Sequence, residues 1–158
     1  MPLAMIALVM ASGSAVPAPT PQPAPSPFLG FWKLDTGSMP TPVDTRPASV
    51  TAEFADAGAG VWNTTYVITA KDGSARRMTS RERLDGQPVP IAGDQTEADS
   101  VAMTSPQRGV LVMGLTKGGN LGSVRVYTVS PDGSEMIESA TFVGEGGKPM
   151  VRRFRWVR

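Results

Sequence analysis

Residues 110–143 read VLVMGLTKGGNLGSVRVYTVSPDGSEMIESATFV, three β-type runs separated by two short turn signals. The turn signals are KGGN at residues 117–120 and PDG at residues 131–133. Their glycines supply the positive φ angles that tight hairpins need. Two consecutive hairpins make an antiparallel meander, so this stretch predicts antiparallel β-structure and sets the expectation for the rest of the chain.

Six more runs of the same kind lie on either side of this stretch, each bounded by turn residues. Within residues 61–70, Trp62, Thr64, Tyr66 and Ile68 occupy alternate positions and share one face. Such alternation is typical of strands that are wetted on one side. No window carries a helical stripe, so we expect at most one short 3₁₀ turn. The nine expected strands are residues 28–34, 48–54, 61–70, 74–84, 100–104, 110–116, 123–130, 135–143 and 150–157.

These runs predict an all-β fold, an antiparallel meander of about eight to ten strands. An open meander would leave two unprotected edges, and closure into a small barrel removes them. A β-sandwich is the alternative, because periodicity does not distinguish the two architectures. Residues 110–115 (VLVMGL) are apolar on both faces, so we expect the most buried strand there, with a bend or a close approach at Gly114.

Two residue types are missing from the 158-residue chain, which has no Cys and no His. Without Cys there are no disulfides, thiolate nucleophiles or zinc–sulfur sites, and without His the usual catalytic triads and the most frequent transition-metal ligand are excluded. We therefore expect a protein that is not an enzyme and has no metal or cofactor. The formal net charge of +1 lacks the basic excess of a nucleic-acid binder, so no nucleic-acid partner is expected.

The N-terminal residues have the composition of an export signal followed by a linker. Residues 3–11 (LAMIALVMA) form an apolar run of signal-peptide length that is too short to span a membrane. Small residues follow at 13–15, so we expect a signal peptide over residues 1–15 and a periplasmic or secreted protein; a disordered apolar N-terminus is the alternative. Residues 16–27 (VPAPTPQPAPSP) predict an extended polyproline II linker. The β-domain then covers residues 28–158, with no lipid anchor or transmembrane segment expected in the mature chain.

The first expected strand reads FLGFWKL at residues 28–34. Its Gly30-x-Trp32 pattern, at the opening strand of an exported β-meander, resembles the first signature of the lipocalin and calycin superfamily. Residues 30–35, 55–61 and 130–136 are similar to three short motifs of a group of secreted bacterial lipocalin-like proteins. The resemblance covers nearly the whole expected domain and favours the barrel.

The resemblance also implies how the barrel is closed. In that family the tryptophan plugs the closed end, and an arginine from the end of the chain packs across its ring. The last expected strand, MVRRFRWVR at residues 150–158, offers such arginines. We therefore expect Gly30 and Trp32, together with Arg152 or Arg155, to join the first strand to the last through a cation–π contact.

Five residues are candidates for binding a ligand inside the barrel. Arg77 and Arg81 share one face of a polar strand, and guanidinium groups suit carboxylate, sulfate or phosphate if that face is the inner one. Glu138 alternates with apolar residues, so an inward position would require an arginine partner or a raised pKa. Arg152 could meet an anionic headgroup at the barrel mouth, and Tyr66 shares the patterned face of its strand. Each of these residues also has a structural explanation, as a barrel closure, a core ion pair or a solvated strand.

The leading interpretation is an exported lipocalin-like protein that binds a small hydrophobic or anionic amphipathic ligand and exists as a monomer or weak dimer. The first rival is an envelope interaction module with a solid core. An interior below about 100–200 Å³ would favour that rival, since ligand pockets typically measure several hundred Å³. The second rival is an enzyme, which would require two carboxylates about 5–10 Å apart in a cleft.

Overall fold

The computed structural model describes residues 24–158. In these residues, short β-type runs separated by glycine turns form eleven antiparallel strands. The all-β prediction is confirmed, and the nine long strands coincide with the nine expected runs. The two remaining strands, of two residues each, were not predicted because they are too short to show a periodic pattern. The strands are β1 (Gly30–Leu34), β2 (Ser49–Asp56), β3 (Val61–Thr69), β4 (Ala75–Arg83), β5 (Val89–Pro90), β6 (Ala92–Gly93), β7 (Ser100–Gln107), β8 (Val110–Lys117), β9 (Asn120–Val129), β10 (Glu135–Val143) and β11 (Pro149–Val157).

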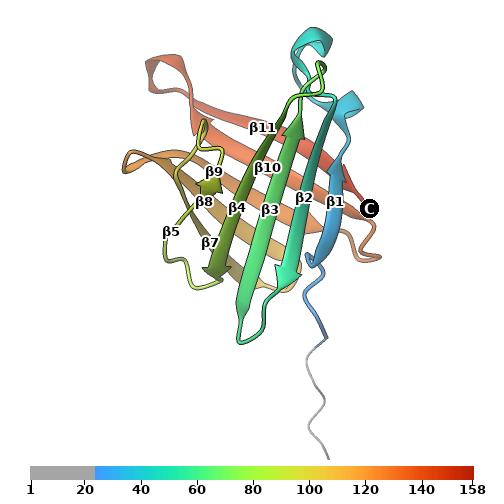
Figure 1. Cartoon of the computed structure of the whole chain (residues 1–158), viewed down its shortest axis with the longest axis vertical. Coiled ribbons are helices and arrows are strands. Elements are labelled where there is room, and N and C mark those ends of the chain that lie inside the picture. Colours follow the sequence, from blue (N-terminus) through green and yellow to red (C-terminus); the bar gives the residue numbers. More distant parts are fainter. Residues whose placement is uncertain (1–23) are drawn as a thin grey trace, which may run out of the picture.

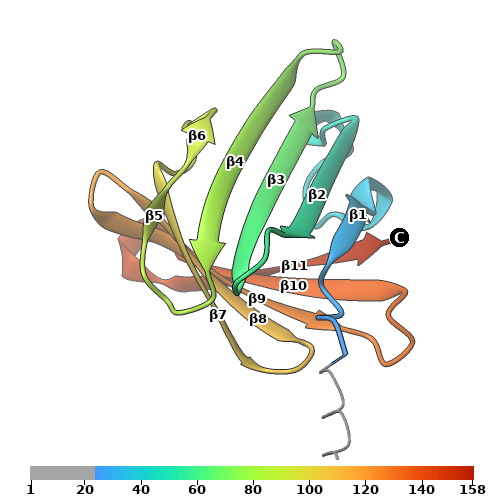
Figure 2. The ribbon, with the colours of Figure 1, turned by 60° about the horizontal axis from the view of Figure 1, so that its bottom comes forward.

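The sheet curls into a nearly closed barrel, in which the first strand of the chain, β1, lies beside the last, β11 (Figure 1). Its strand order is β5-β7-β8-β9-β10-β11-β1-β2-β3-β4-β6, so consecutive strands are neighbours within β1–β4 and within β7–β11. β1 pairs with β11, with Lys33 opposite Val157 and Leu34 opposite Trp156. Strands β1–β4 form one wall and β7–β11 the other (Figure 2). The architecture is therefore the barrel and not the sandwich.

The remaining seam lies between β4 and β7, and the segment carrying β5 and β6 crosses it. β5 pairs with β7, and β6 pairs with β4. At one end of the seam, the Gly86 amide donates to the Met103 carbonyl at 2.8 Å. At the other, Gly93 has a φ of +89°, and a Cβ at that position would overlap the Arg77 carbonyl oxygen. A glycine is therefore needed for the crossing segment to approach β4.

The closed end of the barrel is packed around Trp32, whose side chain is fully buried. Its indole Nε1 donates to the Phe28 carbonyl at 2.8 Å, and the Arg158 guanidinium carbon lies 4.2 Å from the ring centroid. The arginine over Trp32 is therefore Arg158, and the expectation of Arg152 or Arg155 is wrong. The reason is the register: with Lys33 opposite Val157, the residue that directly follows β11, Arg158, comes opposite Trp32.

Two further expectations need correction. Three 3₁₀ turns are present, η1 (Thr36–Ser38), η2 (Val43–Thr45) and η3 (Glu145–Gly147), where at most one was expected. β8 is buried on its inner face only, because a single-layer barrel leaves its outer face half exposed. No helix among residues 24–158 has the length and apolar character needed to cross a membrane. The expected signal peptide (1–15) and most of the expected linker (16–27) lie outside the described residues.

Candidate ligand-binding cavity

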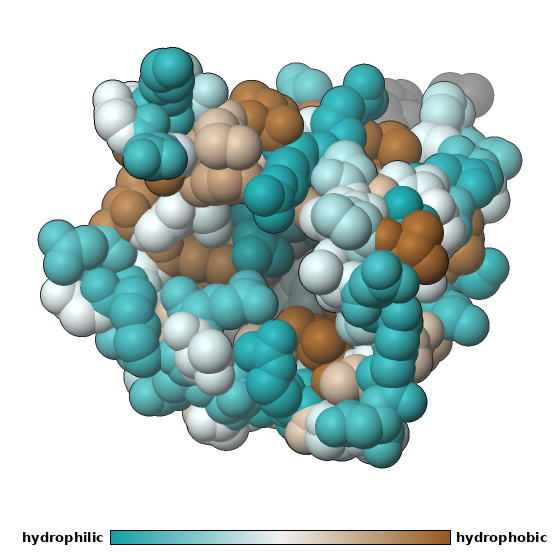
Figure 3. Space-filling view, turned by 90° about the horizontal axis from the view of Figure 1, so that it is seen from above, coloured by the Kyte–Doolittle hydropathy of each residue, from teal (hydrophilic) through white to brown (hydrophobic). Residues whose placement is uncertain are grey.

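The barrel is hollow between its packed end and its opposite end. The cavity measures about 570 Å³. The connections from β1 to β2, β3 to β4 and β10 to β11 gather at the upper end in Figure 1, away from the N-terminal segment. Figure 3 looks onto that end and shows a hollow with hydrophobic side chains inside and hydrophilic ones around it. The apolar lining includes Ile68, Met78, Met103, Met113, Phe142 and Phe154.

The most deeply buried charge of the cavity is Glu138, whose side chain is 3% exposed. Alternation along β10 sends it inward with Met136, Ala140 and Phe142, as the sequence pattern indicated. Both carboxylate oxygens have donors: Arg125 Nη1 lies 3.3 Å from Oε1, and the Trp156 indole donates to Oε2 at 3.0 Å. Burial raises the pKa of Glu138 above its ordinary value, although Arg125 and the Trp156 hydrogen bond act in the opposite direction.

Two tyrosines complete this polar cluster. The Tyr66 hydroxyl donates to the Tyr127 hydroxyl at 3.2 Å, and the Tyr127 hydroxyl lies 3.8 Å from the Met113 sulfur. Burial raises the pKa of both tyrosines, so they stay neutral hydroxyls at physiological pH. Burial acts to lower the pKa of Arg125, but its anionic neighbours Glu138 and Glu97 act to raise it, and the pKa lies above the ordinary value. The Nε of Arg125 is enclosed without an acceptor among the described residues.

From this cluster, a series of ion pairs leads towards the rim of the barrel. Arg125 Nη2 lies 3.4 Å from Glu97, Glu97 lies 3.7 Å from Arg76, and Arg76 lies 3.3 Å from Asp94. Glu97 is about half exposed, so the series passes from the buried cluster to solvent. Each guanidinium in it therefore faces two carboxylates.

The structure brings three of the five expected ligand-binding residues to the cavity. Tyr66 and Glu138 line its interior, and Arg152 lies in its wall, with the guanidinium carbon 4.9 Å from the Phe142 ring centroid. Arg77 and Arg81 point outward, so that expectation is wrong.

The β3–β4 register explains this correction. Arg77 is opposite Val67 and Arg81 is opposite Asn63, both on the outer face of β3. The arginines hydrogen-bond to outer neighbours there, Thr65 at 3.5 Å and Asn63 at 3.3 Å.

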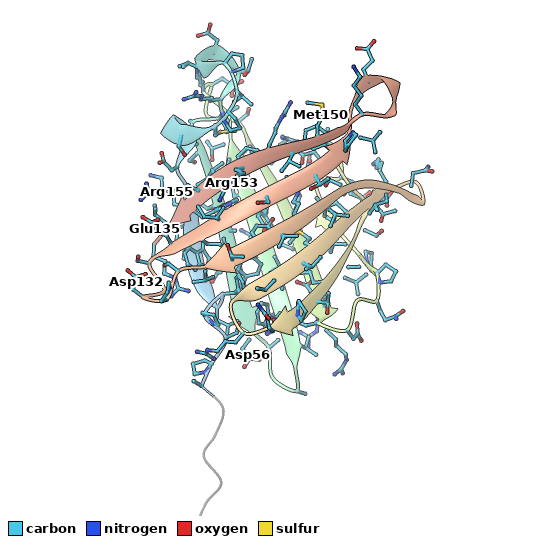
Figure 4. The ribbon with its side chains drawn as sticks, turned by 180° about the vertical axis from the view of Figure 1, so that it is seen from behind. Asp56, Asp132, Glu135, Met150, Arg153 and Arg155 are labelled. Carbon is cyan, nitrogen blue, oxygen red and sulfur yellow. The ribbon has the colours of Figure 1, made fainter. Side chains whose placement is uncertain are left out.

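Arg155, expected at the closure, lies on the outer face of β11. It pairs with Glu135 of β10 and lies 3.4 Å from Asp35, which directly follows β1 (Figure 4). Arg155 thus joins the first and last strands through carboxylates, without contacting Trp32. Gly30 opens β1 with a φ of +114°, a conformation that favours glycine.

Sequence reasoning missed Arg125 and Tyr127, which the structure places at the centre of the cluster. A register count from the PDG turn at residues 131–133 would have found them. A four-residue turn at residues 131–134 makes Ser130 and Glu135 partners, which puts Tyr127 opposite Glu138 and Arg125 opposite Ala140, as observed. It also missed the buried Glu82, which accepts a hydrogen bond from Thr64.

Within residues 24–158 no group of three or more acidic side chains is arranged to hold a metal ion. A scan against models of protein families matches none of them, and a search of curated proteins finds no relative of this chain. A nearly closed antiparallel barrel does not by itself identify a lipocalin. The cavity is therefore the feature of this chain that bears on its function.

Proposed function

We propose that this chain is an exported lipocalin-like protein that binds one small hydrophobic or amphipathic molecule inside its barrel. The observation that carries the proposal is the cavity of about 570 Å³. Protein interiors are normally packed to the density of organic crystals, and ligand pockets occupy about 300–1,000 Å³. The volume therefore falls within the range of ligand pockets and supports the proposal over a solid-core module.

The composition of the lining supports the same proposal. Apolar side chains form most of the cavity wall, and the methionines among them can adapt to irregular shapes. A few polar side chains, among them Glu138 and Tyr66, point into the same part of the cavity. The buried polar groups bond mainly to one another, as Glu138 does with Arg125 and Trp156. This arrangement fits holding a molecule better than transforming it.

Titration with N-phenyl-1-naphthylamine, an uncharged dye that fluoresces in apolar surroundings, tests the proposal. The wild type should bind about one dye per chain. Ala140→Phe places an aromatic ring in the cavity, because Ala140 faces inward on β10, and should weaken binding at least about tenfold. Thr141→Phe is the matched control, since Thr141 is exposed on the outer face of the same strand.

Circular dichroism of both variants establishes that they keep the fold. Saturable dye binding that Ala140→Phe weakens and Thr141→Phe does not would support the proposal. A wild type that fails to bind the dye, or that loses binding equally in both variants, would favour the solid-core module.

A further inference from the structure

The polar cluster of the cavity lies halfway along the barrel, not at its mouth. On β10 the inward residues run from Met136 at the packed end through Glu138 and Ala140 to Phe142. Tyr127 is opposite Glu138, and Arg125 is one inward position nearer the mouth. A ligand that enters from the mouth therefore passes Phe142 and Arg152 before it reaches Glu138 and Tyr66.

The charges of the cluster already compensate one another. Arg125 faces two carboxylates, Glu138 at 3.3 Å and Glu97 at 3.4 Å. An anionic group would have to displace one of them to pair with the Nη atoms of Arg125, and a cation would find both carboxylates already paired. Arg152, the other arginine of the lining, stacks on Phe142 nearer the mouth. Burial also raises the pKa of Glu138 and Tyr66, which means that this part of the cavity disfavours additional negative charge.

The hydroxyl groups of the cluster remain suited to a neutral partner. The Tyr66 oxygen donates to Tyr127 and keeps lone pairs that accept a hydrogen bond. Thr64 and Ser80 line the cavity on the adjoining β3 and β4 wall. Neutral hydrogen bonds can form here without disturbing the ion pairs.

We propose that the ligand is an uncharged amphiphile, whose hydroxyl or carbonyl group is held at Tyr66 and whose apolar part extends along Met78 and Phe142 towards the mouth. This inference rests on the proposed function and narrows it, since the sequence analysis left a hydrophobic or an anionic amphipathic ligand open.

We would test the inference by displacing N-phenyl-1-naphthylamine with twelve-carbon probes that differ only at one end. The probes are 1-dodecanol, dodecanoate, dodecylammonium and, without a head group, dodecane. The wild type at pH 7.5 should bind 1-dodecanol at least about tenfold more tightly than dodecanoate or dodecylammonium. Tyr66→Phe should weaken 1-dodecanol about threefold to tenfold and leave dodecane unchanged, because only the hydroxyl contact is removed.

Alcohols partition into apolar sites better than carboxylates do, so a second arm separates this effect from recognition. Glu138→Gln removes one of the two carboxylates on Arg125 and should shift the ratio of dodecanoate to 1-dodecanol affinity at least about tenfold towards dodecanoate. If that variant does not fold, Glu97→Gln makes the same change at a half-exposed position and should shift the ratio in the same direction.

Three results overturn the inference. The first is a wild type that binds dodecanoate as tightly as 1-dodecanol. If Arg152→Ala then loses dodecanoate binding, an anionic head group lies at the mouth of the cavity. The second is an affinity ratio that neither carboxylate variant moves. In both, probe binding persists and the proposed function stands. In the third, no probe displaces the dye and the dye itself does not bind, so the proposed function fails as well.

Discussion

Replacing Trp32 by alanine removes a fully buried side chain from the packed end of the barrel. Deleting a buried tryptophan costs about 3–5 kcal/mol, through lost burial and the cavity that remains. Two contacts place this residue in the upper half of that range. The indole hydrogen bond to Phe28 contributes about 1 kcal/mol and the Arg158 cation–π contact about 0.5–1 kcal/mol at an exposed site. We expect Trp32→Ala to lower the free energy of unfolding by about 4–5 kcal/mol.

Urea denaturation followed by far-ultraviolet circular dichroism measures this loss without depending on tryptophan fluorescence. The matched control is Phe31→Ala on the same strand, where the side chain is 56% exposed and the expected loss is below about 1 kcal/mol. Arg158→Ala should cost about 0.5–2 kcal/mol, and the double variant should lose less than the sum of the two single losses because the residues are in contact. A loss below about 1 kcal/mol for Trp32→Ala would refute the argument that this residue closes the barrel.

Two further predictions concern the seam and a turn. Gly93→Ala should lower the free energy of unfolding by about 1–3 kcal/mol in the same urea assay, because its Cβ would overlap the Arg77 carbonyl oxygen. Gly86→Ala is the control, since Gly86 has a similar φ but open space around it, and its loss of stability should be smaller. Equal losses in the two variants would contradict the close approach of Gly93 to β4. Hydrogen bonds from Ser130 and Ser134 lower the pKa of Asp132 to about 2, so its stabilising contribution is present above the ordinary aspartate pKa and is lost as pH falls towards 2. The difference in thermal midpoint between wild type and Asp132→Asn should therefore shrink as pH falls from about 5 to about 2. A difference that stays constant over this range would show that the charge of the Asp132 carboxylate does not stabilise the turn.

The strands and their order were predictable from sequence because this chain marks its hairpins with glycine. The PDG turn at residues 131–133 sets the β9–β10 register, which in turn places Tyr127 opposite Glu138. β5 and β6 were not predictable, since two-residue strands have no period. Their pairing arises from the seam that the long strands leave open.

The site was less predictable because the alternation of residue types along a strand separates its two faces but does not determine which face points into the barrel. β4 has arginines on both faces, and only its register with β3 shows that Met78 faces inward and Arg77 outward. Likewise, which arginine covers Trp32 depends on how β1 and β11 align, and hydropathy does not determine that alignment. Polar groups that bond to one another inside a barrel, such as Glu138 and Arg125, resemble surface residues in the sequence.

The most direct test of the binding proposal is native mass spectrometry of the full chain, after incubation with a lipid extract of a bacterial envelope and removal of unbound lipid. We expect a one-to-one adduct of a few hundred daltons on the wild type and on Thr141→Phe, with little or none on Ala140→Phe. A wild type that keeps only its ligand-free mass, or an adduct equally abundant on Ala140→Phe, would contradict the claim that the barrel interior is a binding site.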